Sequence, residues 1–196
     1  MNRTLTALGL VSALALAACG GTDNTTTTID NMGMASPLPM DNADMGDMGN
    51  GMATAAVSAG QAFANTVAAS DAYEIEAGKL AQQKATTQAL KDFGKMMVDG
   101  HSTTTEKLKA LAANTDPKIT PDPALTAEQQ ANLQTLRDAT GADFDAAYKA
   151  QQVAAHTKAL AALKDYAASG DVAQFKTFAG ETAPVVKMHL DKIKGM

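Results

Sequence analysis

This chain of 196 residues has a single cysteine, no tryptophan and fewer basic than acidic residues. The single cysteine, Cys19, excludes an intramolecular disulfide. The 16 basic residues are outnumbered by 21 acidic ones, and a net charge of −5 is not typical of nucleic-acid binding, so we expect no nucleic-acid partner. Aromatic residues make up only 4% of the chain and alanine is abundant, a composition that favours helices.

Residues 1–18 are predicted to be a lipoprotein signal peptide. Arg3 gives a positive start, and an apolar stretch follows that is too short to span a bilayer. The ending Leu16-Ala17-Ala18-Cys19 resembles the lipobox of bacterial lipoproteins, which implies cleavage before Cys19 and its acylation. Several acyl chains would anchor the protein stably to a membrane, and Gly20 after the cysteine implies the outer membrane. The alternative is an ordinary signal peptide that happens to end in cysteine.

Residues 19–57 are predicted to be a disordered tether rich in Met, Gly, Asp and Thr. Few large aliphatic residues are available there to offset the entropy of an ordered chain. Thioether sulfur is a soft ligand that suits Cu(I), so the tether is a candidate copper site, although a solvated linker with incidental methionines explains it as well. The candidate soft-metal ligands are Met32, Met34, Met40, Met45, Met48 and Met52.

Residues 58–196 are predicted to fold as an all-α domain. Four long segments place apolar residues at alternating steps of three and four, the period of an amphipathic helix. They span about 59–84, 88–113, 143–169 and 171–194. The apolar stripe of the first includes Ser70, and that of the last includes Val185. A shorter helix is expected to begin at the capping box formed by Thr126 and Gln129 and to end at Gly141.

The order of these helices predicts a ferritin-like four-helix bundle. About 29 residues separate the second and third long helices, enough for the chain to return along the bundle and start the third helix at the same end as the second. The short helix would lie within this crossover connection. That topology brings the polar residues of the four stripes to similar depths.

One ionisable residue interrupts the apolar stripe of each long helix. They are Glu74, His101, His156 and His189, and they include all three histidines of the chain. Imidazole nitrogens and a carboxylate that converge in a core could bind Zn, Cu, Mn or Fe. The alternative is a hydrogen-bonded polar layer that fixes the register of the helices. The chain has no Glu-x-x-His pair on these stripes, which argues against a di-iron centre.

Several stretches resemble the bacterial family known as domain of unknown function 4142. They are Glu74-Ile-Glu-Ala-Gly-Lys-Leu-Ala81, Phe93-Gly-Lys-Met-Met-Val-Asp-Gly-His101, Phe144-Asp-Ala-Ala-Tyr148, Gln151-Gln-Val-Ala-Ala-His156, and Pro184 with His189. The resemblance implies a ferritin-like bundle in a secreted or lipid-anchored envelope protein with no established activity. The family pattern has an aspartate directly before the second-helix histidine, whereas this chain has Gly100 there and Asp99 one residue earlier.

The sequence favours a binding protein over an enzyme. It has no glycine-rich phosphate loop, and no serine lies in the context of a nucleophile elbow. We therefore expect a lipid-anchored envelope protein, in the periplasm or at the cell surface, with a non-catalytic binding or stress-related role. The alternative functions are transition-metal binding by the Glu/His set and copper binding by the tether.

Overall fold

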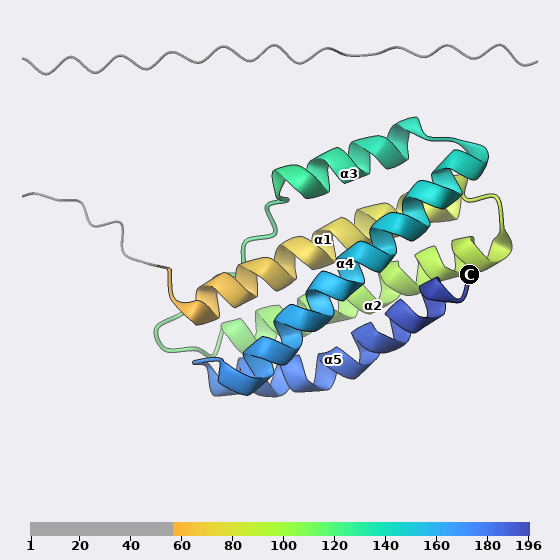
Figure 1. Ribbon diagram of the computed structural model, residues 1–196. Helices are drawn as coiled ribbons and strands as arrows, with labels where there is room; N and C mark the ends of the chain where they lie inside the picture. The colour runs from red at the N-terminus through yellow and green to blue at the C-terminus, as the bar shows by residue number, and fades with distance from the viewer. Residues whose placement is uncertain (1–56) are drawn as a thin grey trace, which may run out of the picture. The chain divides into compact units, whose positions relative to one another are not determined.

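The computed structural model describes residues 57–196, and within that range it consists of five helices and no strand (Figure 1). The helices are α1 (Ala59–Lys84), α2 (Gln88–Ala112), α3 (Ala127–Asp138), α4 (Gly141–Ser169) and α5 (Ala173–Lys194). The predicted all-α class is confirmed for this part of the chain. The predicted signal peptide, the lipidation site Cys19 and the six methionines of the tether lie outside the described residues. None of the described helices is both long and apolar enough to cross a membrane.

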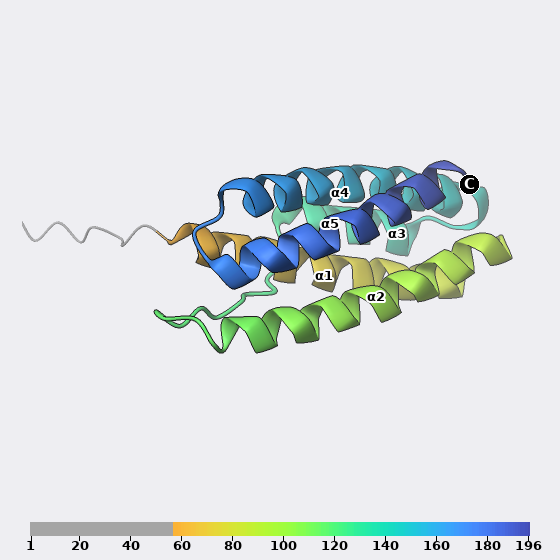
Figure 2. The same ribbon diagram turned by 90° about the horizontal axis from the view of Figure 1, so that it is seen from below.

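The backbones of α1 and α2 approach closely at two glycines. A Cβ atom added to Gly78 would lie 2.6 Å from the carbonyl oxygen of Gly94, and one added to Gly94 would lie 2.7 Å from that of Gly78. No larger residue fits at either position without moving the helices apart. α4 and α5 form a second antiparallel pair, and the two pairs lie on opposite sides of the core (Figure 2).

α3 carries the chain back along the molecule before α4 begins. Its capping box is confirmed, because the N–H of Gln129 donates to the Thr126 hydroxyl at 3.2 Å and the N–H of Thr126 donates to the Gln129 side chain at 2.9 Å. α4 starts beside the turn between α1 and α2, where the N–H of Thr86 donates to the Asp145 carboxylate at 3.0 Å. α2 and α4 therefore begin at the same end of the molecule (Figure 1).

Two local predictions are wrong. α3 ends at Asp138, and Gly141, with a φ of +57°, is instead the first residue of α4. A positive φ carries little cost only for glycine, so this residue redirects the chain into the next helix. On α5, Val186 is buried while Val185 is 46% exposed, because the inward face follows a step of four from Thr182 rather than a step of three.

The core consists of two apolar clusters with a polar layer between them along each long helix. One cluster includes Phe63, Leu163 and Phe178, and the other includes Phe93 and Tyr148. The buried polar residues are Asp71, Glu74, His101, Gln152, His156 and His189. On each long helix they fall between residues of the first cluster and residues of the second. The fold thus brings the polar interruptions of four separate stripes to one level.

Candidate metal centre

The three histidines meet in this polar layer. His101 on α2, His156 on α4 and His189 on α5 are 8%, 2% and 5% exposed. Their ring centroids lie 6.0 Å (His101–His156), 6.2 Å (His101–His189) and 5.6 Å (His156–His189) apart. One nitrogen from each ring lies within 4.8 Å of the other two, so a single ion could contact all three. We call these residues the histidine cluster.

Hydrogen bonds fix the tautomers of two of the three rings. The Nδ1 atom of His156 lies 2.9 Å from the carbonyl oxygen of Gln152, and a carbonyl oxygen can only accept, so Nδ1 carries the proton. The Nδ1 atom of His101 lies 2.7 Å from a carboxylate oxygen of Asp71 and donates in the same way. In the neutral form of each ring, the Nε2 atom therefore carries the lone pair.

Those lone pairs are buried and have no hydrogen-bond partner. The unpartnered ring nitrogens are Nε2 of His101, Nε2 of His156 and Nδ1 of His189. A buried polar atom without a partner destabilises the fold by about 1–3 kcal/mol, so a layer with only a structural role would rarely contain three of them together. A metal ion would give all three a partner at once.

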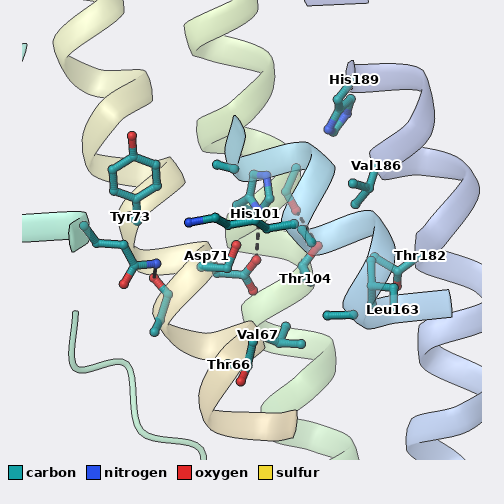
Figure 3. Close-up of a pocket in the computed structure, with 18 of the residues that line it drawn as sticks. Thr66, Val67, Asp71, Tyr73, His101, Thr104, Leu163, Thr182, Val186 and His189 are labelled. Carbon is teal, nitrogen blue, oxygen red and sulfur yellow. Dashed lines mark hydrogen bonds and ion pairs between the residues drawn. The ribbon is translucent and has the colours of Figure 1, made fainter. Parts of the chain in front are cut away.

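Asp71, which sequence reasoning missed, is the residue that orients His101. It is 2% exposed, and its second oxygen accepts a hydrogen bond from the Thr105 hydroxyl at 3.1 Å. Figure 3 shows Asp71 and His101 facing each other, with His189 on α5. The predicted apolar stripe of α1 includes Ser70, the residue before Asp71. The available signal was the spacing of three between Asp71 and Glu74, which places both carboxylates on one side of a helix.

Glu74 lies beside the histidine cluster rather than among its unpartnered nitrogens. One of its oxygens accepts a hydrogen bond from the Gln152 side chain at 2.6 Å, and the other lies 3.7 Å from Nδ1 of His156. Nδ1 is the protonated side of that ring. Among the described residues, the set whose donor atoms converge on one point contains the three histidines without Glu74.

The charges of the layer are set mainly by burial. Burial lowers the pKa of His156 to about 3 and that of His189 to about 4, so both rings are neutral at pH 7 and can donate a lone pair. Burial also raises the pKa of Glu74 to about 7 and raises the pKa of Asp71. Burial alone would lower the pKa of His101, but Asp71 and Glu74 raise it overall.

A pocket of about 370 Å³ adjoins the histidine cluster. His101, His189 and Asp71 line it, together with apolar side chains such as Val67, Leu163 and Val186 (Figure 3). His156 and Glu74 do not line it. We call this space the apolar pocket.

Comparison with known proteins identifies a family for this chain but no individual protein that matches it. No curated protein matches the chain, and no solved structure does. A family model matches residues 47–196, which cover the helical region and most of the whole chain. The resemblance seen in the sequence is thereby confirmed. The chain belongs to the family described as Domain of unknown function (DUF4142).

Proposed function

We propose that this protein binds one transition-metal ion between His101, His156 and His189. The observation that carries the proposal is the convergence of three buried imidazoles, in which one nitrogen of each ring lies within 4.8 Å of the others and each ring has a buried nitrogen without a hydrogen-bond partner. Each is held in place by a different helix. Neutral imidazole is a ligand for Zn, Cu, Fe and Ni, and the lowered pKa values of His156 and His189 keep those rings available at neutral pH.

The surroundings of the histidine cluster support a metal. The Asp71–His101 pair has the arrangement in which a carboxylate fixes the orientation of a metal-bound imidazole and raises its basicity. In their ionised forms, the carboxyl groups of Asp71 and Glu74 would offset the charge of a divalent ion. Three histidines with one position left for water or another molecule form a set typical of open zinc sites. Zn and Cu are therefore preferred among the candidate ions, which also include Mn and Fe.

We further propose that the helices form a ferritin-like four-helix bundle that serves as a lipid-anchored receptor for its ion in the cell envelope. The shared starting end of α2 and α4 supports the crossover topology. The lipobox-like sequence before Cys19 supports the anchor, since several acyl chains hold a protein stably at a membrane. A binding role is preferred to catalysis, because the sequence has no glycine-rich phosphate loop and no serine in the context of a nucleophile elbow.

Metal titration of the full chain carrying Cys19→Ser, made without a histidine tag, tests the proposal. That substitution removes the only thiol, which would otherwise compete for the ion. After titration with Zn, Cu(II), Mn and Fe(II) and removal of free ions, we expect one ion per chain. His101→Gln and His156→Gln should lose it while circular dichroism still reports the helices.

Two results would count against this site. A folded protein with no ion above background would remove metal binding by the histidine cluster. An ion retained by both histidine variants would instead indicate the methionines of the tether, which a peptide of residues 20–57 titrated with Cu(I) would reveal. The variants are compared with Gln82→Ala, a substitution on α1 that touches neither the cluster nor the apolar pocket.

A further inference from the structure

The apolar pocket lies between the two helix pairs, α1 with α2 and α4 with α5. Its walls come from α1, α2, α4 and α5, and residues at the start of α3 close part of its rim. Lys158 and Glu128 line it as well, and their exposed side chains form an ion pair with a nitrogen–oxygen distance of 2.6 Å. Since lining residues are exposed at this point, the pocket opens to solvent here. Its volume of about 370 Å³ is within the range of small-molecule sites.

The threonines of the pocket offer few free donors to an occupant. The hydroxyls of Thr66, Thr104 and Thr182 donate to carbonyl oxygens one turn earlier in their own helices, at 2.9, 3.0 and 2.7 Å. Asp71 is engaged by His101 and Thr105. The wall therefore consists mainly of methyl and methylene groups, and the buried unpartnered polar atoms of its lining belong to His101 and His189.

The position of these two histidines indicates which side of the ion is open. His101 and His189 line the pocket, whereas His156 and Glu74 do not. An ion held by the three rings would have its remaining coordination position toward the pocket. A molecule in the pocket could then reach the ion directly.

We propose that the apolar pocket binds a small, mostly apolar molecule whose single neutral nitrogen or oxygen donor completes the coordination of the ion. This inference rests on the proposed metal site. The neutral donor follows from the lining of the pocket, whose walls are mainly methyl and methylene groups and whose threonine hydroxyls on α1, α2 and α5 already donate to backbone carbonyl oxygens. An anion there would be a buried charge with few hydrogen-bond donors around it, which is unfavourable away from water.

Spectroscopic titration of the Co²⁺-loaded full chain carrying Cys19→Ser tests this inference. Co²⁺ accepts imidazole ligands, and its visible absorption changes when a ligand is exchanged. The probe is 4-phenylimidazole, which combines a neutral nitrogen donor with an apolar ring. Phenylacetate serves as the anionic comparison of similar size. We expect saturable spectral change with 4-phenylimidazole and at least tenfold weaker binding of phenylacetate.

Filling the pocket should block the probe without removing the ion. Ala162 is half-buried and lines the pocket, so Ala162→Phe should weaken 4-phenylimidazole at least tenfold at unchanged Co²⁺ stoichiometry. Ala161→Phe, on the exposed side of the same helix, is the matched control and should bind like the parent. Val185→Phe, at an exposed position that also lines the pocket, gives a second test should Ala162→Phe misfold.

Failure of the proposed metal site and failure of the pocket inference give different results. A chain that takes up no Co²⁺ overturns both the metal site and this inference. A loaded chain whose spectrum does not respond to 4-phenylimidazole overturns this inference alone. Equal binding to the parent and to a folded pocket-filling variant, or tighter binding of phenylacetate, would also refute it.

Discussion

Replacing Asp71 by asparagine tests whether the layer is built around a metal ion. The carboxylate lies 2.7 Å from Nδ1 of His101 and accepts a hydrogen bond from it, and Nε2 of the same ring is buried without a partner. If the asparagine oxygen takes that place, His101 keeps its tautomer but loses the negative charge that raises its basicity. If the asparagine amide turns toward His101, Nδ1 must accept, and the proton moves to Nε2, where it blocks the ion. Both orientations weaken metal binding.

The expected magnitude follows from comparable positions in metalloproteins. Loss of a carboxylate behind a metal-bound histidine costs about 10- to 100-fold in affinity, which corresponds to about 1.4–2.7 kcal/mol. The apparent Kd for Zn²⁺ is measured at pH 7.5 by competition with a chromogenic chelator. Metal-free Asp71→Asn should remain folded, because the Thr105 hydroxyl can donate to the asparagine oxygen or accept from its NH2 group, whichever faces it.

The matched control for this prediction is Asp99→Asn on α2. Asp99 is exposed and pairs with Lys95, so its replacement should leave the Zn²⁺ affinity unchanged. An affinity of Asp71→Asn within threefold of the parent would refute the reasoning. An equal loss in both variants would show that general surface charge, rather than the orientation of His101, governs binding.

Two further predictions concern stability without metal. Burial raises the pKa of Glu74 from 4.5 to about 7. The protonated side chain therefore contributes its full share to the free energy of unfolding below pH 4.5, and this contribution of about 3 kcal/mol is lost as the pH rises through 7. The free energy of unfolding of Glu74→Gln, measured in urea, should therefore fall less between pH 5 and 8 than that of the parent or of Glu76→Gln; parallel curves would contradict this. Gly78→Ala should destabilise the fold by about 1–3 kcal/mol, because its Cβ would lie 2.6 Å from a carbonyl oxygen of α2. Gly180→Ala should instead stabilise the fold by up to about 1 kcal/mol, because nothing lies within 4 Å of the added Cβ and alanine favours a helix. Equal effects of the two glycine substitutions would contradict the close approach.

Local features of the fold could be predicted because they depend on neighbours along the chain. The period of the apolar residues located the helices, and the pair Thr126 and Gln129 located the start of α3. The errors arose where one step in the period was ambiguous. A step of three instead of four selected Val185 over Val186, and the same ambiguity on α1 selected Ser70 over Asp71.

The candidate site could be predicted only in part. Each histidine was visible as a polar interruption of an apolar stripe, and all three are buried in one layer. The separate position of Glu74 and the support of His101 by Asp71 depend on how the side chains of different helices are oriented. Periodicity gives the face on which a residue lies, but it does not give the hydrogen-bond partner that a side chain finds there.

The sequence alone determined the helices and, except for Asp71, the charged and histidine residues that would need partners in the core. Composition and periodicity are local properties, so one chain is sufficient to read them. Only the tertiary structure decided which partners these residues have. Asp71 and the carbonyl oxygen of Gln152 each hydrogen-bond to Nδ1 of one ring, that of His101 and that of His156. The second nitrogens of these rings and Nδ1 of His189 are buried without partners, and the three rings converge. That convergence exists because three helices bring their histidines to one level, a long-range relation that no local pattern encodes.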